Sequence, residues 1–545
     1  MKKTILNRII AFVCVMAMAL TLTSCGKKRE EGVPLKEGDT FTVAIAQTPD
    51  SFNPTLSEGG LSEEFFLLCY DPLWRINAAG DPVPCLVDGY SLSSDQLTWT
   101  IRLKKGVTFC DEDTTELTSA DVAFSYETLR AYSTLYKGYF DGIRDIRCPD
   151  DYTVVISTEY VKGDLMYSPV PILPRSIWRD YQFAPENYEN ASLIGTGPFV
   201  FDEAATAASE GCWIFRARED YHMGAAKVAA VVFSENSTPT SAARAVSAGM
   251  ADAAFGMTDV QLTTLEGVPG IDLVTAMQPR GECWALVYNL QSEMFASTVM
   301  RQVVEYCADR DWILSMGCGG AGVVGSSFAV PGNDYFVPVT GILAYSPDYA
   351  LSNLRATGYM DLNEDGYLDN AKEETLRMTM FTSNRDSWAA TAGTILSNEL
   401  TEIGVKMNWK KTDAAVTEAC SDPDDWHMCL MSWRGDRNPV AAAMNFREQM
   451  EELTGWQSGS FDGVLEQLRT AMDQQTIQSL AGQLQQIVYN ESPCIVLAYS
   501  ADVQVVSSEY WAGYEEILAD AGGLFGMGFY DTYMQVMPAG SETES

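Results

Sequence analysis

The sequence predicts an α/β fold with more than one domain, and two observations lead to this prediction. Segments rich in β-branched and aromatic residues alternate along the chain with segments whose apolar residues recur at helical spacing. The chain has 545 residues, of which 46% are hydrophobic, so it can fill packed cores but exceeds what one core usually supports. This alternation favours lobes in which helices pack on sheets.

The expected elements are spread along the whole chain. The first predicted helix opens at Thr118 and Asp121, residue types that are typical of a helix start, and its stripe is Val122, Tyr126 and Leu129. In full, helices are predicted around residues 118–129, 300–307, 395–403 and 480–488, and strands around residues 41–46, 97–103, 405–409, 426–430 and 495–498.

The N-terminus has the pattern of an export signal. The basic residues Lys2, Lys3 and Arg8 precede an apolar run at residues 9–22 that is too short to span a bilayer. Small residues follow this run, as they do before a signal cleavage site. We therefore expect residues 1–24 to be a signal peptide.

The signal ends in Leu22-Thr23-Ser24-Cys25, which is similar to the lipobox of bacterial lipoproteins. In that motif the cysteine is acylated and becomes the mature N-terminus. We expect lipidation at Cys25, a flexible charged tether at residues 25–36, and an exported protein anchored to the cell membrane. The alternative is an ordinary signal peptide in which Cys25 is incidental.

The chain is strongly acidic, with a formal net charge of −38 at pH 7. Removing the three basic residues of the signal peptide leaves 33 basic and 74 acidic residues, a formal charge of −41. Polyanions such as DNA and RNA are poor partners for such a surface, so nucleic acid is excluded. We expect the charge to serve solubility and to oppose aggregation.

Cysteine and histidine content restricts the possible chemistry. Of the 13 cysteines, Cys14 lies in the signal and Cys25 at its end, and the remaining 11 cannot all pair within one chain. We expect mostly free, buried thiols, with one or two disulfides as the alternative. His222 and His427 are the only two histidines, so a catalytic triad or a histidine-rich metal site is not expected. No enzyme and no cofactor are expected.

Three short motifs have simpler explanations than the sites they suggest. The glycines of residues 317–322 follow a helix-like segment rather than a strand, so we expect a loop and not a dinucleotide site. Cys420, His427 and Cys429 alternate with apolar residues and predict a core strand rather than a metal site. The tripeptide Arg434-Gly435-Asp436 spells a cell-attachment motif, but such triplets arise often by chance.

Residues 361–369 leave two interpretations open. Asp361, Asn363, Asp365 and Asp369 carry side-chain oxygens at alternate positions, and a glycine stands sixth, as in a calcium loop. The bidentate glutamate expected at the twelfth position is replaced by Lys372. The segment is therefore either a structural turn or a calcium site.

Other motifs follow one another in a fixed order along the mature chain. They are Thr48–Pro54, Tyr70–Leu73, Leu97–Phe109, Thr118–Ser125, Gly195–Phe199, Arg301–Val303, Ala308–Arg310 and Tyr345–Asp348. In this order they resemble the family 5 extracellular solute-binding proteins, the peptide-binding type of ABC importer receptor. Two segments depart from the family pattern: Cys110–Asp113 replaces His-Asp-Gly, and residues 204–210 look like an insertion.

The resemblance implies a two-lobed periplasmic-binding-protein-like fold, with a hinge and a ligand cleft between the lobes. Lobe I would comprise residues 37–282 and the returning residues 500–538, lobe II residues 283–499, and residues 539–545 a tail. A monomer that captures di- or oligopeptides and passes them to an ABC permease with its ATPase is implied. A non-peptide solute, such as an oligosaccharide, a nickel chelate or haem, is the alternative.

The same resemblance assigns candidate ligand-binding residues. In peptide-binding relatives, a Trp-x-x-Asp segment before an Asn/Asp-Pro turn lines the cleft, and Trp433 and Asp436 fit this spacing. Asp436 would pair with the α-ammonium group of the ligand, and Trp433 would form a pocket wall. The alternative is that Asp436 only caps its loop, paired with Arg434 or Arg437. Ser57 and Gly59 would supply backbone hydrogen bonds from the first lobe.

Overall fold

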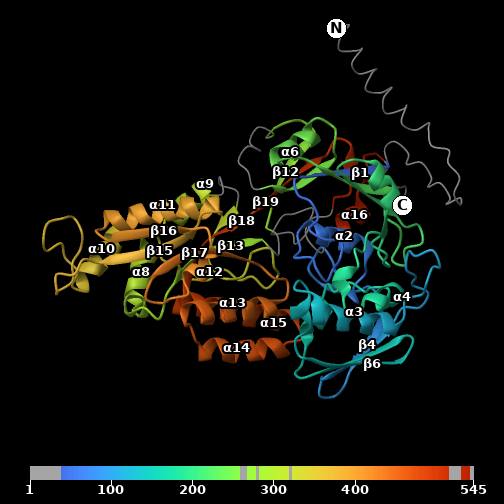
Figure 1. The fold of residues 1–545 in the computed structure, drawn as a ribbon, viewed down its shortest axis with the longest axis horizontal. Helices are drawn as coiled ribbons and strands as arrows, with labels where there is room; N and C mark the ends of the chain where they lie inside the picture. Colours follow the sequence, from blue (N-terminus) through green and yellow to red (C-terminus); the bar gives the residue numbers. More distant parts are fainter. Residues whose placement is uncertain are drawn as a thin grey trace, which may run out of the picture. The chain divides into compact units, whose positions relative to one another are not determined.

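A seven-stranded sheet brings together strands from both ends of the chain (Figure 1). Strand β1 pairs in parallel with its two neighbours, whereas β19 pairs antiparallel with β11 and β12. The spatial order is β12 (Ile271–Ala276), β19 (Asp502–Ser507), β11 (Ala253–Met257), β1 (Thr40–Ile45), β10 (Ala230–Glu235), β9 (Cys212–Ala217) and β8 (Phe199–Phe201). Helices α2 (Leu61–Cys69) and α6 (Pro239–Ser247) pack beside this sheet.

This computed structural model describes residues 39–257, 265, 267–277, 281–317, 322–514 and 530–540, and residues 38–545 form one compact unit. The expected signal peptide, the lipidated Cys25 and the tether lie outside the described residues. So do most of the glycine-rich segment 317–322 and of the expected tail.

A six-stranded sheet forms a second core. Its order is β14 (Gly322–Val324), β18 (Cys494–Ser500), β13 (Glu282–Tyr288), β17 (Met428–Arg434), β15 (Arg377–Ser383) and β16 (Lys406–Thr412). Strands β13 and β18 are buried along almost their whole length, because helices cover both faces of the sheet.

The two faces of this sheet follow from the alternation of side chains along each strand. Leu286 and Leu430 contribute to one core together with α8 (Thr298–Tyr306), α10 (Pro347–Ala356) and α11 (Ser387–Glu402). Val287 and Cys429 contribute to the other. That core is completed by α13 (Pro439–Thr454), α14 (Gly459–Thr470) and α15 (Gln474–Glu491).

A four-stranded antiparallel sheet makes a smaller layer, in the order β4 (Val87–Leu92), β5 (Thr98–Leu103), β7 (Thr153–Thr158) and β6 (Ile143–Asp150). Helix α3 (Ser119–Tyr132) packs against it, and Thr118 and Asp121 form the capping box of this helix. Short pieces complete the chain: β2 (Trp74–Ile76), β3 (Pro82–Pro84), α4 (Arg175–Trp178), α5 (Glu203–Ala208), α7 (Glu293–Ala296), α9 (Arg310–Gly317), α12 (Val416–Ala419), β20 (Trp511–Ala512), α16 (Asp531–Gln535) and β21 (Met537–Pro538).

The α/β prediction is confirmed, and the sheets divide the chain near the expected lobe boundaries. The seven-stranded sheet takes strands between residues 40 and 276 and again at 502–507, and the six-stranded sheet takes strands between residues 282 and 500. The lobe limits themselves stay a prediction. The segment 204–210, which looked like an insertion, falls largely on α5.

The ten cysteines within the described residues are free thiols, and seven of them are buried, as expected. Within the same residues, no helix combines the length and the apolar character needed to cross a membrane.

Candidate functional site

The candidate binding site is a cavity of about 840 Å³ that lies between α13 and the C-terminal end of α3. Pockets for small ligands have volumes in this range. Its wall combines the short 3₁₀ helix η1 (Lys137–Phe140) with segments from both predicted lobes. The charged lining residues are Glu58, Arg130, Lys137, Asp141, Lys162, Asp164, Asp436 and Glu448. Carboxylates and cations thus face the same space.

Asp436 lies on the wall of this cavity, in the loop between β17 and α13. Its Oδ1 accepts the backbone N–H of Asn438 at 2.9 Å and the hydroxyl of Tyr139 at 3.3 Å. The Tyr335 hydroxyl donates to its backbone carbonyl. Asp436 therefore caps its own loop, as the alternative interpretation required, and also faces the cavity. Its role as anchor for an ammonium group stays a prediction.

Trp433 lies at the end of β17 and is half-buried. Its indole N–H donates to the carbonyl of Phe328 at 3.0 Å, and its ring packs edge-on against Phe446 with centroids 5.6 Å apart. It is not one of the residues that line the 840 Å³ cavity. The structure therefore places Asp436, but not Trp433, on this cavity wall.

Ser57 and Gly59 belong to a loop that is organised by Asp50. The Asp50 carboxylate accepts the Ser57 hydroxyl at 2.9 Å and the Ser62 hydroxyl at 2.5 Å. Burial alone would raise the pKa of Asp50, but the hydrogen bonds from Ser62 and its neighbours outweigh burial and hold the pKa below its usual value.

The N–H of Gly59 donates to Ser57 Oγ at 3.1 Å, and Ser57 is fully buried. The structure thus uses these groups inside the loop, and the exposed Glu58 between them lines the cavity.

A second set of residues joins the predicted lobes, and no sequence pattern predicted it. Asn438 caps α13 by accepting the N–H groups of Val440 and Ala441 at 2.9 and 3.1 Å. Its amide donates to Asp164 Oδ2 at 2.5 Å, and Asp164 pairs with the buried Lys162 at 2.8 Å. An Asn-Pro pair is typical of a helix start, but no pattern around Asp164 predicts its hydrogen bond with Asn438.

A buried carboxyl group lies on α2, close to these segments. Glu64 is 2% exposed, and the hydroxyl of Tyr533 donates to it at 3.2 Å. Burial raises the pKa of Glu64 to about 8, although Tyr533 and the charge of Arg437 oppose this shift. At neutral pH this carboxyl group is therefore largely protonated.

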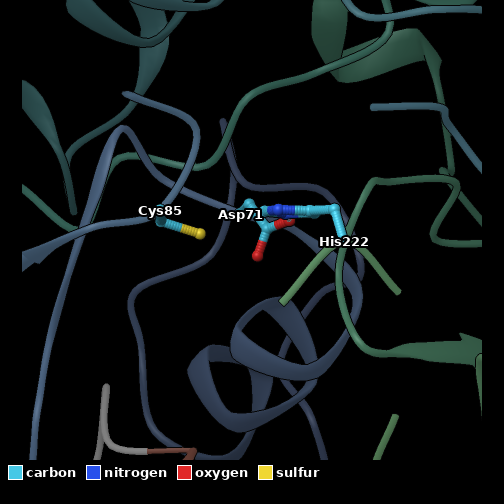
Figure 2. Close-up of side chains that lie close together, drawn as sticks. All are labelled: Asp71, Cys85 and His222. Atoms are coloured by element: carbon cyan, nitrogen blue, oxygen red, sulfur yellow. Dashed lines mark hydrogen bonds and ion pairs between the residues drawn. The ribbon is translucent and has the colours of Figure 1, made fainter. Parts of the chain in front are cut away.

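One cluster has side chains that can ligate a metal ion: Asp71, Cys85 and His222 (Figure 2). Their donor atoms lie within 4.8 Å of one another, and no other trio of His, Cys, Asp or Glu among the described residues meets this distance. Asp71 sits between the other two side chains, and His222 Nε2 lies 2.9 Å from Asp71 Oδ2. No sequence pattern had predicted a role for His222.

The bonds around Asp71 do not suit a metal centre. Its oxygens also accept the Arg75 guanidinium at 2.7 Å, the Tyr221 hydroxyl at 2.9 Å and the Thr196 hydroxyl at 3.0 Å. Burial would raise the pKa of Asp71, but Arg75 and His222 hold it far below its usual range. A cation at this point would displace these bonds and meet the Arg75 charge. We therefore interpret the cluster as a structural ion pair.

The segment with Cys420, His427 and Cys429 contains the expected core strand, β17. His427 Nδ1 accepts the backbone N–H of Thr379 at 3.0 Å, and Cys429 is buried on β17. Cys420 and Cys429 contribute to the packing on one face of the six-stranded sheet.

Comparisons with known proteins place the chain among transport receptors. A sequence model of one family, described as "Bacterial extracellular solute-binding proteins, family 5 Middle", matches residues 81–449. The chain is 22% identical over 520 residues to Di/tripeptide-binding protein 1 of Pseudomonas aeruginosa, covering 90% of this chain and 94% of that protein. It is 21% identical over 495 residues to Heme-binding protein A of Haemophilus influenzae, covering 85% and 87%.

A solved structure supports the fold. The oligopeptide-binding protein AppA from Bacillus subtilis, in complex with a nonapeptide, matches with a TM-score of 0.68 at 20% identity. The match covers 92% of this chain and 100% of that chain. At this identity the likeness concerns the fold alone.

Proposed function

Because this chain belongs to the bacterial extracellular solute-binding proteins of family 5, we propose that it captures di- or oligopeptides and delivers them to the permease of an ABC importer. The observation that carries the proposal is the cavity between α3 and α13, whose wall has both acidic and basic side chains. A free peptide carries an ammonium group at one end and a carboxylate at the other. The cavity wall offers carboxylates and cations for both.

In this proposal Asp436 anchors the peptide's amino terminus. The Asp436 carboxylate already accepts the hydroxyl of Tyr139, so it is directed toward the cavity. An ammonium group at this position forms a charge-assisted hydrogen bond, which is shorter and stronger than one between neutral groups. Lys137 on η1, an exposed cation of the wall, is the partner we propose for the peptide's carboxylate.

The test compares one peptide in two forms. Calorimetric titration with a free tripeptide and with its N-acetylated form measures what the ammonium group contributes. We expect the acetylated form to bind at least tenfold more weakly, because the carboxylate loses its charged partner. Equal affinities would move the ligand away from peptides with free amino termini.

A relative named for haem keeps a non-peptide solute as the second candidate. Neither His222 nor His427 lines the cavity, so this site offers no histidine ligand for haem iron or nickel. Mass spectrometry of ligand that co-purifies with the protein distinguishes peptides from haem, a metal chelate or an oligosaccharide.

We also propose that the receptor is held at the cell membrane by lipidation of Cys25. The support is the lipobox-like ending of the signal sequence. Replacing Cys25 with serine should move the protein from the membrane fraction to the soluble fraction or block its maturation. A Cys25→Ser protein that is processed normally and stays with the membrane contradicts this proposal.

A further inference from the structure

The loop between α10 and β15 has side-chain oxygens at every second position. Asp361, Asn363 and Asp365 stand first, third and fifth, Gly366 stands sixth, and Asp369 stands ninth. None of these residues lines the cavity between α3 and α13, so the loop is not part of the candidate binding site.

Hydrogen bonds curl the loop around its own oxygens. Asp361 accepts the N–H groups of Asp365 and Gly366 at 3.1 and 3.0 Å, and Asn363 Oδ1 accepts the N–H of Asp365 at 2.9 Å. Gly366 has a φ of 88°, a conformation that favours glycine and makes the turn possible. Each accepting oxygen has a second lone pair, so these bonds do not exhaust its capacity.

Asp369 supplies the observation that points to a ligand. It is 1% exposed, and its Oδ2 accepts the N–H of Leu362 at 3.3 Å, so its carboxylate faces the loop. Its Oδ1 is buried without any hydrogen-bond partner. The neighbouring Leu368 is packed in the core and donates its N–H to Gly404 at 2.8 Å, and the N–H of Asp369 itself donates to Met360 at 2.8 Å, so the backbone at Asp369 is held against the core.

A buried carboxylate oxygen without a partner is costly, and the surrounding charge increases the cost. Residues 361–374 include six acidic residues and one basic residue, Lys372. A cation bound within the loop relieves both problems, and its ligands here would all be oxygens, which calcium prefers.

We propose that this loop binds one calcium ion through Asp361, Asn363, Asp365, the carbonyl of Tyr367 and Asp369. Calcium takes six to eight oxygen ligands, so water completes the shell. The three carboxylates are not yet within 4.8 Å of one another, so binding tightens the loop. Lys372 replaces the bidentate glutamate of the strongest loops, and we expect a Kd of about 10⁻⁴ to 10⁻³ M, as in extracellular modules.

The test is calorimetric titration of CaCl₂ into the purified protein after treatment with a chelator, with MgCl₂ as a second titrant. Asp369→Asn removes the buried charge, and Asp365→Asn removes the negative charge of an exposed ligand, so the test stands even if the buried variant fails to fold. Glu364→Gln removes one charge from the same loop at a position that is not a ligand, and serves as the matched control. Circular dichroism verifies the fold of each variant.

We expect one calcium per chain in the unmodified protein and in Glu364→Gln, and binding at least tenfold weaker in both ligand variants. Magnesium should bind much more weakly, because it demands a tighter octahedral site. No saturable binding up to about 10 mM calcium overturns the proposal. So does an unchanged affinity in a folded ligand variant, equal binding of magnesium, or an equal loss in Glu364→Gln.

Discussion

Arg75, Thr196, Tyr221 and His222 surround the carboxylate of Asp71, which has no exposure to solvent. The sequence identified Asp71 only as part of a family motif. Its partners Tyr221 and His222 lie 150 and 151 positions away in the chain, and no local pattern predicts such a contact. Only the fold shows that this aspartate organises a buried cluster.

Replacing Asp71 with asparagine should destabilise the protein by about 3–5 kcal/mol, because the buried Arg75 loses its counter-charge. Denaturant unfolding measures the change, and Asp88→Asn on the exposed edge of β4 should stay within about 0.5 kcal/mol. Because the pKa of Asp71 is depressed in the folded state, its stabilisation is present above the unfolded pKa and is lost as the pH falls below it. A loss under about 1 kcal/mol contradicts the ion-pair interpretation.

Asp436→Asn should weaken the binding of a free peptide about 100- to 1000-fold, because the ligand's ammonium group then lacks a counter-charge in a partly desolvated site. Glu448→Gln is the matched control, since it removes a charge from an exposed position on the same cavity wall. Solvent and salt screen such exposed charges, so the control should change affinity less than about threefold. Equal effects of the two substitutions would falsify the anchor role of Asp436.

Glu64 makes stability depend on pH near neutrality. In the folded state its pKa is about 8, whereas an unperturbed glutamate titrates at about 4.3, so the unfolded state loses this proton first. Stability should therefore fall as the pH rises from about 5 to 8. Between pH 5.5 and 7.5 the free energy of unfolding should fall by about 2 kcal/mol more in the unmodified protein than in Glu64→Gln, as measured by denaturant unfolding. Parallel curves for the two proteins, with Glu127→Gln as exposed control, contradict this prediction.

At the scale of single elements, local periodicity predicted much of the structure. The helices expected around residues 118–129, 395–403 and 480–488 are parts of α3, α11 and α15, because their apolar stripes face a core. The expected strands are found as β1, β5, β16, β17 and β18 with small shifts at their ends. The Gly59 amide could not be placed in this way, because its bond to Ser57 depends on how Asp50 gathers the whole loop.

Asn438 performs two roles at the start of α13, and two substitutions separate them. Asn438→Ser keeps a helix cap but loses the amide that reaches Asp164, whereas Asn438→Ala loses both. The free energy of unfolding should fall by about 1.5–3 kcal/mol in the serine variant, which is the range for a hydrogen bond to a charged group. It should fall by about 1 kcal/mol more in the alanine variant, because the helix cap is lost as well. Denaturant unfolding measures both values. Equal stability of the serine variant and the unmodified protein would assign Asn438 to capping alone.

At the scale of the whole molecule, the resemblance inferred from ordered motifs is confirmed by the match of the family model and by solved two-lobed structures. The order of the motifs predicted this fold, because each motif can be recognised locally and their order along the chain is typical of the family. It did not predict which residues touch across the cavity. The contacts Tyr139–Asp436, Asp164–Asn438 and Tyr167–Gln474 join residues 274 to 307 positions apart, and each depends on the final placement of two cores.

These three contacts lead to a prediction about closure. Proteins of this architecture close by hinge motion around their ligand, and each hydrogen bond between the lobes adds to the stability of the closed state. Small-angle scattering should show a smaller radius of gyration when a saturating peptide is added. Without ligand, Asn438→Ser should have a larger radius than the unmodified protein, because losing about 1.4 kcal/mol shifts the closed-to-open ratio about tenfold. With saturating peptide the two radii should converge, since the ligand contributes its own bonds to both lobes. A radius that does not respond to peptide, or a variant indistinguishable from the unmodified protein at every peptide concentration, contradicts a hinge held by these contacts.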